Sequence, residues 1–348
     1  MALTEADVKK ALTKVKFPGL SRDIVSFGFV RSVTVSDGDV SVEIVMTTAN
    51  AGAGEIVERE ARRVLSGLPG VREVKLDCRV HTPQAAPSVQ APRDLLPGVR
   101  TKIAVASGKG GVGKSTVAAN LALALRRMGS AVGLLDADIY GPSQQMMMGC
   151  TDKPMLSAEE KILPVDGHGV KVMSLGFLMD ADTPVIWRGP MVMKALQQFI
   201  EDVDWGTLDY LIVDLPPGTG DAQLTMTQQV PLDGAVIVTT PQDVALIDAR
   251  KGLAMFRKVN VPVLGVIENM SAFVCPHCGK TSEIFKHGGG RRTAEQLGVP
   301  FLGEIPIDPA IVAGGDAGTP IVVSHPKSAA AQAFVAVAAE IARQLTGR

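Results

Sequence analysis

One short segment constrains the fold more than any other: Gly108–Thr116 reads Gly-Lys-Gly-Gly-Val-Gly-Lys-Ser-Thr. It fits the pattern G-x-x-x-x-G-K-[ST], with the apolar run 102–107 before it and a helical pattern over Ser115–Met128 after it. A glycine-rich loop between a strand and a helix is suited to binding phosphate groups, because its backbone can approach them closely. The pattern therefore predicts a nucleotide-phosphate site at this turn.

The residue types of the loop suit ATP with Mg²⁺. Glycines allow backbone N–H groups to close around phosphate oxygens, and the helix N-terminus adds positive potential. Lys114 is predicted to reach the β- and γ-phosphates and to act in catalysis, and the Ser115 hydroxyl is predicted to ligate Mg²⁺. The predicted nucleotide-binding residues of the loop are Gly108, Gly110, Gly111, Val112, Gly113, Lys114, Ser115 and Thr116.

After residue 100, apolar runs alternate with helical stretches such as Val244–Val259. The runs cover residues 102–107, 131–138, 170–177, 209–216, 234–241 and 263–270. Strands that are apolar at nearly every position are buried on both faces, which favours a mainly parallel sheet flanked by helices. In such sheets the ligand lies at the carboxyl ends of the strands. We therefore expect residues 100–348 to form an α/β P-loop NTPase domain.

Two acids follow strands of this sheet. Asp138 closes the segment Leu134–Asp138 and is the candidate for orienting the attacking water. Asp214 follows four apolar residues, as expected of a Walker B aspartate that holds Mg²⁺ through water, because it would otherwise be buried unpaired. Gly218–Asp221 has the glycines of a switch segment that senses the γ-phosphate, although Asp221 could instead be a helix N-cap.

The first 81 residues predict a separate small α/β domain. Its pattern contains a helix at about Glu5–Lys14, an alternating strand pair with a turn at Asp37-Gly38, a helix over Glu55–Leu68 and a strand over 72–80. Between residues 82 and 99, repeated prolines with alanine and glutamine exclude a continuing helix or a central strand. We interpret residues 82–99 as an interdomain linker.

Cys275 and Cys278 form a C-x-x-C pair, and Pro276 and Gly279 favour a tight turn that brings both thiolates to one metal centre. Two ligands do not complete a tetrahedral zinc site or an iron-sulfur cluster, and the chain has no second C-x-x-C. The pair is therefore a candidate metal site that needs further ligands.

Two completions of that site and one reading without a metal are open. A second subunit could supply its own cysteine pair across a two-fold axis, and four thiolates suit a [4Fe-4S] cluster that would stay accessible and transferable. His277 or His287 could instead join within one chain to hold zinc. A redox pair is the third reading, which the weak helix signal after Gly279 disfavours.

Composition limits the partners. The chain has 35 basic and 36 acidic residues, so its net charge of -1 gives no overall attraction to nucleic acid or to an anionic membrane. No apolar run approaches the roughly 18 residues of a membrane span, and the N-terminus lacks the apolar core of a signal peptide. Cys78 and Cys150 stand alone, which favours reduced thiols. We therefore predict a cytoplasmic protein without nucleic-acid or membrane partners.

Lys109 places a second lysine early in the loop, and in this respect the loop resembles those of the deviant Walker A, or signature-lysine, ATPases. The resemblance implies a homodimer in which this lysine crosses the interface and supplies positive charge at the partner's γ-phosphate. It makes Lys109 a candidate catalytic residue beside Lys114 and Asp138. Taken alone, Lys109 could be only a solvated loop lysine.

Further segments make nearly the whole chain similar to the Mrp (ApbC-type) iron-sulfur cluster carrier ATPases. They are Asp136–Ser143, Trp187–Met191, Asp214–Asp221 and Glu268–Ser271, while Phe17–Val25 resembles the small domain fused to many of these carriers. The resemblance implies ATP hydrolysis coupled to loading or release of a [4Fe-4S] cluster held by a homodimer. It also implies transfer to apo iron-sulfur proteins and interaction with cluster assembly proteins. It further implies that Asn269 contacts the adenine, although Asn269 could otherwise be a turn residue that closes its strand.

Two other functions stay open at this point. A positioning ATPase of the ParA/MinD kind, with a structural zinc knuckle, would bind DNA or membrane, and this requires a basic surface or an amphipathic anchor. A reductase resembling the nitrogenase iron protein would pass electrons through a bridging cluster, but its cluster cysteines lie far apart in sequence, unlike Cys275 and Cys278.

Overall fold

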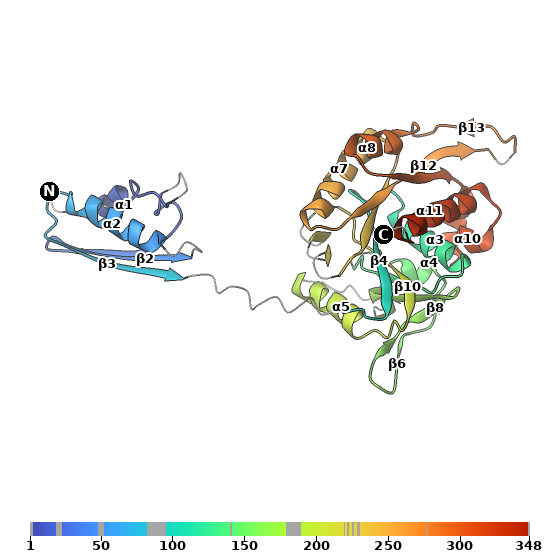
Figure 1. Cartoon of the computed structure of the whole chain (residues 1–348), viewed down its shortest axis with the longest axis horizontal. Helices are drawn as coiled ribbons and strands as arrows, with labels where there is room; N and C mark the ends of the chain where they lie inside the picture. The colour runs from blue at the N-terminus through green and yellow to red at the C-terminus, as the bar shows by residue number, and fades with distance from the viewer. Residues whose placement is uncertain are drawn as a thin grey trace. The chain divides into compact units, whose positions relative to one another are not determined.

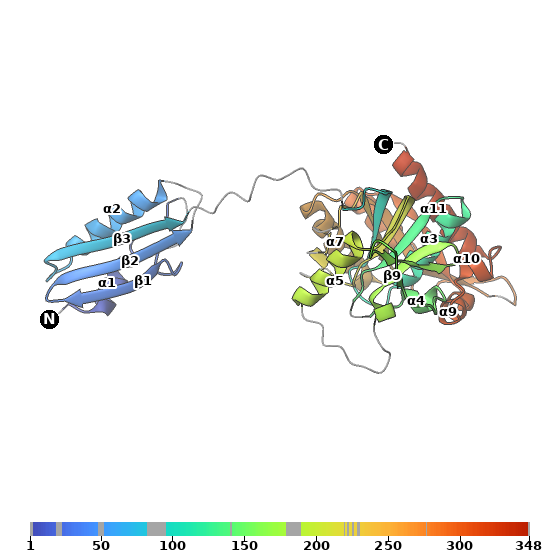
Figure 2. The same ribbon diagram turned by 90° about the horizontal axis from the view of Figure 1, so that it is seen from below.

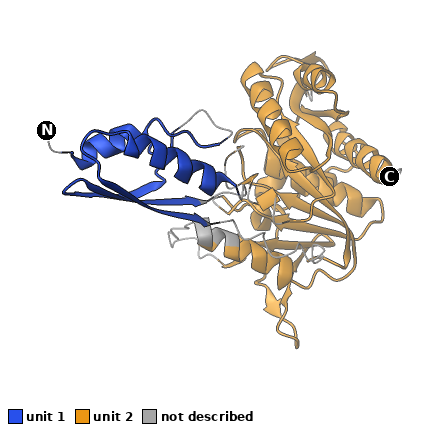
Figure 3. Cartoon of the chain, turned by 60° about the vertical axis from the view of Figure 1, so that its left-hand side comes forward, with its two compact units in different colours: residues 1–93 blue, residues 94–348 orange. Residues whose placement is uncertain are grey.

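The chain forms two compact units, residues 1–93 and 94–348 (Figure 3). Each unit has hydrophobic core clusters made from its own residues. The computed structural model describes residues 3–18, 23–47, 52–81, 95–139, 141–178, 189–218, 220, 223–224, 226–227, 230–275 and 277–346. Most of the predicted linker, 82–99, lies outside these ranges, and its last residue, Val99, belongs to the first strand of the larger unit.

The smaller unit is a three-stranded sheet with two helices. Its elements are α1 (Glu5–Leu12), β1 (Val30–Ser36), β2 (Asp39–Thr47), α2 (Ala53–Ser66) and β3 (Glu73–His81). β1 and β2 are antiparallel and turn at Asp37, which has a φ of 48°, and Gly38, while β2 and β3 are parallel. Because side chains of a strand alternate between faces, every second residue of β2 from Val40 to Met46 enters the core.

The larger unit is built on a nine-stranded sheet with the order β13-β12-β11-β4-β10-β5-β9-β8, in which β14 also pairs with β12 (Figure 1). Its long strands are β4 (Val99–Ala106), β5 (Val132–Asp136), β9 (Val170–Ser174), β10 (Leu208–Asp214), β11 (Gly234–Thr239), β12 (Val263–Val274) and β14 (Phe301–Ile307). These seven pair in parallel, whereas β8 (Val165–Gly167) and β13 (Thr281–Ser282) are antiparallel to their neighbours. The predicted α/β class with a mainly parallel sheet is confirmed.

Helices cover both faces of this sheet (Figure 2). They are α3 (Lys114–Arg127), α4 (Gln144–Met147), a 3₁₀ turn (Leu175–Leu178), α5 (Gly189–Glu201), α7 (Asp243–Lys258), α8 (Gly289–Leu297), α9 (Pro309–Asp316), α10 (Ile321–Ser324) and α11 (Ala329–Thr346). α3 and α11 pack against each other, and α7 and α8 pack on β11 and β12. Because the right-handed crossovers β4–α3–β5 and β11–α7–β12 run in opposite directions along the sheet, α3 and α7 lie on opposite faces. Among the described residues, no helix has the length and apolarity needed to cross a lipid bilayer.

Several features differ from the sequence expectations. β12 does not end at Met270 but continues to Val274, with an irregularity at Met270, whose φ is 57°. β14 was not expected, because Gly303 and Pro306 interrupt its apolar pattern, and the small hairpin of β6 (Met155–Leu156) and β7 (Ile162–Leu163) was also missed.

Candidate functional site

The glycine-rich loop joins β4 to α3 at the carboxyl end of the sheet. Gly111 and Gly113 have φ values of 80° and 79°, a backbone region that side chains disfavour, and a Cβ on Gly110 or Gly111 would face open space. A hollow of about 220 Å³ lies over the loop, lined by Ser107, Lys109, Gly110, Gly111, Gly113, Lys114, Ser115, Thr116, Asp138 and Pro217. The loop therefore presents its backbone to a cavity that can take phosphate groups.

Lys114 is the charged centre of this site. Its Nζ atom lies 2.5 Å from Oδ1 of Asp214 and 3.6 Å from Oδ2 of Asp138, and it lies 3.2 Å from the Ser115 hydroxyl. The lysine is 6% exposed, and the Asp214 side chain is fully buried. The fold thus gathers the residues that the sequence assigned to phosphates, metal and water, bringing them from α3, the end of β10 and the loop after β5.

A second buried carboxylate, Asp136, was not assigned a role from the sequence. It lies opposite Asp214 on the neighbouring parallel strand, and its oxygens accept bonds from the backbone of Asp138, Ser143 and Gln144 and from the Ser174 hydroxyl. Burial, and next the charge of Asp214, raise the pKa of Asp136 to about 7. The signal available in the sequence was that Asp136, like Asp214, is an acid at the end of an apolar run.

Gln144 connects these acids and was also missed. Its side-chain amide nitrogen donates to Oδ2 of Asp214 at 2.8 Å and to the Ser115 carbonyl at 3.0 Å, and its backbone N–H donates to Asp136 at 3.0 Å. Its Oε1 atom is buried and has no hydrogen-bond partner among the described residues. A polar residue at the start of a four-residue helix gave no signal in the sequence.

Asp138 and Lys109 also border the hollow, and Oδ2 of Asp138 lies 3.6 Å from the Lys114 Nζ atom. Burial raises the pKa of Asp138, an effect that the nearby Lys114 partly opposes. Lys109 is half-buried, and within the described ranges no carboxylate oxygen lies within 4.0 Å of its Nζ atom. Both side chains are therefore placed to act on a group bound in the hollow.

Asn269 lies within β12, and its side chain contacts the glycine-rich loop. Its side-chain Nδ2 donates to the Val112 carbonyl at 2.9 Å, and the side chain is buried. The closing-turn alternative for Asn269 is wrong, because β12 continues for five residues beyond it. Its predicted adenine contact stays a prediction.

The cysteine pair occupies the turn between β12 and β13. Val274 pairs with Thr281, the Cys275 N–H donates to the Lys280 carbonyl at 3.0 Å, and the Gly279 N–H donates to the Cys275 carbonyl at 2.9 Å. Backbone N–H groups of His277 and Cys278 at its sulfur lower the pKa of Cys275. Cys278 is exposed. This hairpin turn favours a metal knuckle over a redox pair, which normally lies at a helix N-terminus.

The other candidate ligands lie elsewhere. In the described part of the chain, one group of three His, Cys, Asp or Glu ligand atoms lies mutually within 4.8 Å, formed by Glu268, His287 and Glu304, and it contains neither cysteine of the pair. This placement disfavours His287 as a zinc ligand beside the thiols, and His277 is not in the group. Burial raises the pKa of both remaining thiols, Cys78 and Cys150, to about 11, so neither is poised as a thiolate.

Some predicted segments cannot be placed. Tyr140, Trp187, Arg188, Thr219 and Asp221 lie outside the described residues, as do Pro276 of the knuckle and parts of Phe17–Val25. Of the switch segment, Gly218 is described and has a φ of 102°, a value that favours glycine.

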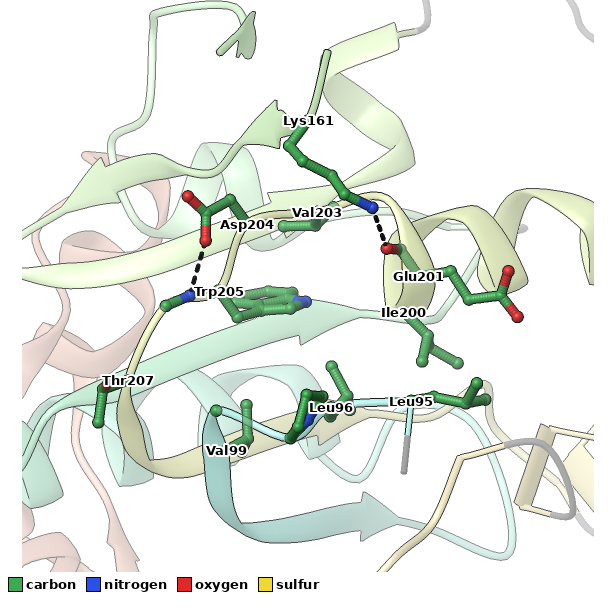
Figure 4. A pocket seen from close by; sticks show the side chains of 13 residues that line it. Leu95, Leu96, Val99, Lys161, Ile200, Glu201, Val203, Asp204, Trp205 and Thr207 are labelled. Atoms are coloured by element: carbon green, nitrogen blue, oxygen red, sulfur yellow. Dashed lines mark hydrogen bonds between the residues drawn. The ribbon is translucent and has the colours of Figure 1, made fainter. Parts of the chain in front are cut away.

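The larger unit has another hollow, of about 450 Å³ (Figure 4), and its lining shares no residue with the hollow over the glycine-rich loop. It opens at the amino ends of β4 and β10, where Leu95, Leu96, Ile200 and Trp205 line it and Lys161 donates to the Glu201 carbonyl at 2.8 Å. Ligands of parallel sheets bind at the opposite, carboxyl ends of the strands. The smaller hollow over the glycine-rich loop is therefore the candidate ligand site.

Comparisons with known proteins agree with this site. A family described as "NUBPL iron-transfer P-loop NTPase" matches residues 98–342, and one described as "Iron-sulfur cluster assembly protein" matches residues 5–76. The chain is 47% identical to an iron-sulfur cluster carrier protein of Synechocystis, over 99% of this chain and 98% of that one.

Two solved structures share the fold of the larger unit. A nucleotide-binding protein of Archaeoglobus fulgidus in complex with ADP has a TM-score of 0.59 at 41% identity, covering 65% of this chain and 90% of its own. The cell division ATPase MinD of Pyrococcus furiosus has a TM-score of 0.53 at 26% identity, covering 70% of this chain and 99% of its own.

Proposed function

The chain belongs to the family of NUBPL-type iron-transfer P-loop NTPases, and we propose that it is an ATP-hydrolysing carrier that holds a [4Fe-4S] cluster between two copies of itself. It delivers the cluster to apo iron-sulfur proteins after loading by cluster assembly proteins. The cluster is cargo, and ATP is the substrate. One observation carries the proposal: an exposed two-thiol knuckle lies at the end of the same strand whose middle contacts the phosphate loop.

The knuckle supports a shared cluster. Its two thiols provide half of the four sulfur ligands that a [4Fe-4S] cluster takes. The three-ligand group of the described residues does not include either thiol, so a second copy of the chain is the simplest source of the missing pair. A cluster bound at an exposed turn between two subunits can be released when the subunits rearrange.

The site over the phosphate loop supports ATP with Mg²⁺. Its backbone N–H groups and lysine ammonium can donate hydrogen bonds to phosphate oxygens, while its serine hydroxyl and carboxylate offer the hard oxygen ligands that Mg²⁺ prefers. Bound Mg²⁺ would neutralise charge on the transferred phosphoryl group. Ser115 and Asp214 would hold it, the Asp214 carboxylate acting through water.

The remaining roles in ATP binding and hydrolysis belong to side chains of the protein. Lys114 leaves its carboxylate partners for the β- and γ-phosphates. Asp138 accepts a hydrogen bond from the attacking water and so fixes the direction of attack, while Lys109 of the second copy offsets negative charge at the γ-phosphate. Asn269 lies beside the loop, where it would also meet the adenine. The segment Asp214–Asp221 passes the state of the γ-phosphate to the subunit interface.

A positioning ATPase with a structural zinc knuckle is the alternative, since MinD shares the fold. That function needs a basic or amphipathic surface, and a chain with a net charge of -1 offers no overall basic field. Salt-sensitive DNA binding, or one tightly bound zinc per chain that iron and sulfide do not displace, would favour it.

The deciding experiment is anaerobic reconstitution with iron and sulfide, followed by absorption spectra, iron counting and sizing. We expect about four iron atoms per dimer in the wild type and loss of the cluster in Cys275→Ser/Cys278→Ser. Cys150→Ser is the matched control, because it removes a half-buried thiol from another part of the unit and should leave loading unchanged. A double variant that loads and delivers cluster normally would refute the ligand assignment.

A further inference from the structure

The loop that carries the cysteines is anchored at both of its ends by one buried residue. Glu268 is fully buried and lies in β12 at the last position where this strand pairs with β11, before the strand continues along β14 to the knuckle. The chain returns from the knuckle at Gly288, whose N–H donates to the Glu268 carboxylate at 3.0 Å, and the Gly290 N–H donates to the same carboxylate. The outgoing and returning ends of the loop therefore meet at Glu268.

A second contact holds the returning end. His287 Nε2 lies 2.8 Å from Oε2 of Glu304, and Glu304 is the residue opposite Glu268 where β14 pairs with β12. Arg291 Nη2 lies 3.4 Å from the other oxygen of Glu304. These contacts fix the base of the knuckle loop to two paired strands.

The same base touches the phosphate loop. Asn269, next to Glu268, donates from Nδ2 to the Val112 carbonyl at 2.9 Å. The contact is close-packed, because a Cβ on Gly113 would lie 2.3 Å from that nitrogen. A glycine at position 113 is thus needed both for its positive φ and for the Asn269 amide.

Peptide planarity couples the Asn269 hydrogen bond to the orientation of the Gly113 N–H group. The Val112 carbonyl and the Gly113 N–H belong to one planar trans peptide group and point in opposite directions. When the Gly113 N–H turns toward a phosphate, as loops of this type require, the Val112 carbonyl must turn away from it, toward Asn269. The strength of the Asn269 hydrogen bond therefore depends on what the phosphate loop binds.

We propose that Asn269 is a positioning residue that transmits nucleotide occupancy from the Val112–Gly113 peptide through β12 to the cysteine knuckle. β12 is the shortest covalent route, since Cys275 follows Asn269 by six residues, about 20 Å of extended chain. Glu268 and Glu304 fix the base of the knuckle loop. A shift at Asn269 therefore moves the knuckle and is not taken up by a rearrangement of the loop base. The inference rests on the proposed function only in taking the knuckle as the cargo site.

The test measures thiol reactivity in the full-length, reduced, iron-free chain. Cys78 and Cys150 are first replaced by serine, so that only the knuckle thiols react with iodoacetamide. Alkylation rates are compared without nucleotide, with saturating Mg-ADP, and with a saturating Mg complex of a non-hydrolysable ATP analogue. We expect nucleotide to change the rate by about five- to 150-fold, the range that couplings between sites usually span.

The decisive variant is Asn269→Asp, which keeps the side chain's size but loses the donor to Val112. Its nucleotide saturation is verified by calorimetry, and we expect the nucleotide effect on alkylation to vanish. Ser271→Ala is the matched control, because it removes a buried hydrogen bond from the same strand, to Ile305 of β14, without touching the phosphate loop. It should keep the full nucleotide effect.

A further variant keeps the proposal testable if Asn269→Asp does not bind nucleotide. Glu304→Gln weakens the His287 anchor away from the phosphate loop, so we expect normal nucleotide affinity, faster alkylation in every state and a smaller nucleotide effect. Identical wild-type rates with and without nucleotide would overturn the proposal, as would an undiminished nucleotide effect in saturated Asn269→Asp or in Glu304→Gln. Failure of cluster reconstitution with an intact nucleotide effect would instead refute the carrier function alone.

Discussion

Two lysines of one loop have surroundings that suit them to different tasks. Lys114 is buried between Asp138 and Asp214, so its charge is held in place for the phosphates of its own site. Lys109 is half-buried and, among the described residues, has no carboxylate within 4.0 Å. A lysine without a local counter-charge at the rim of a phosphate site is available to a neighbouring molecule.

This difference predicts complementation between two inactive variants. Lys109→Ala and Lys114→Ala should each lose ATP hydrolysis, by about 10³-fold for Lys109 if it acts like an arginine finger in trans. In a mixture, the Lys114→Ala chain supplies Lys109 to the intact site of the other chain. About a quarter of the wild-type rate should return, because half of random dimers are mixed and each has one complete site. A mixture as inactive as its parents would place Lys109 in cis.

His287 predicts a pH dependence at the base of the knuckle loop. The hydrogen bond to Glu304 raises its pKa above the ordinary 6.5, and the charges of Glu304, Glu268 and Glu283 act in the same direction. A raised pKa in the folded state means that the stabilisation is complete below pH 6.5 and is lost as pH rises through the higher value. His287→Gln should therefore lower the unfolding free energy at acidic pH, by at most about 1 kcal/mol for so exposed a pair, and have less effect above neutral pH.

The measurement for His287 is denaturant unfolding of both proteins across this pH range. Arg291 also contacts Glu304, so Arg291→Gln is the control that weakens the same carboxylate's contacts without a titrating group. A His287→Gln effect that grows with pH would contradict the assignment.

At the scale of elements, the phosphate loop depends on one backbone conformation. Gly113 caps α3 with a φ of 79°, and a methyl group there would meet the Asn269 amide. Gly113→Ala should therefore lower the free energy of unfolding by about 1–3 kcal/mol and weaken nucleotide binding at least tenfold. Gly252→Ala in α7 is the contrasting control, because no neighbour within 4 Å would meet its methyl group and alanine should stabilise that helix by about 1 kcal/mol. Denaturant unfolding and nucleotide-binding calorimetry on both variants test this prediction. A Gly113→Ala variant with unchanged unfolding free energy and unchanged nucleotide affinity would be evidence against the close contact with Asn269.

Strands that are buried on both faces could be predicted from the sequence, and a strand at the edge of the sheet could not. β4, β5, β10 and β11 each contain an uninterrupted apolar run, so their positions and the P-loop between β4 and α3 follow from pattern alone. β14 pairs with β12 alone among the described strands, and as an edge strand it tolerates the Pro306 that hides it.

Within the site, the sequence predicted the motif residues but not the contacts that arise from tertiary structure. Asp138 and Asp214 stood out because they end apolar strands. The pairing of Asp136 with Asp214 depends on strand register, and the contact of Asn269 with Val112 joins positions 157 residues apart. Neither relation leaves a local pattern.

At the scale of the whole molecule, the two units have independent cores. The core of residues 1–93 includes Val8, Ile24, Ile44 and Leu65, and none of its members comes from the larger unit. The phosphate loop and the cysteine knuckle both belong to the larger unit. The residues proposed for nucleotide binding and cargo binding therefore all belong to the larger unit, and the smaller unit matches the iron-sulfur cluster assembly family.

This division predicts that a chain of residues 94–348 keeps the chemistry and loses delivery. Its nucleotide affinity should stay within about twofold of the full chain's, since no contact to the ligand is removed, and its iron content after reconstitution should be unchanged. Transfer to an apo acceptor, followed by the acceptor's regained activity, should slow by about tenfold if docking through the smaller unit raises the local concentration. Adding residues 1–93 as a separate chain should not restore the rate, because a docking unit works only when attached to the carrier. Loss of cluster loading in the shortened chain would show that the smaller unit takes part in the cargo site itself, contrary to this assignment.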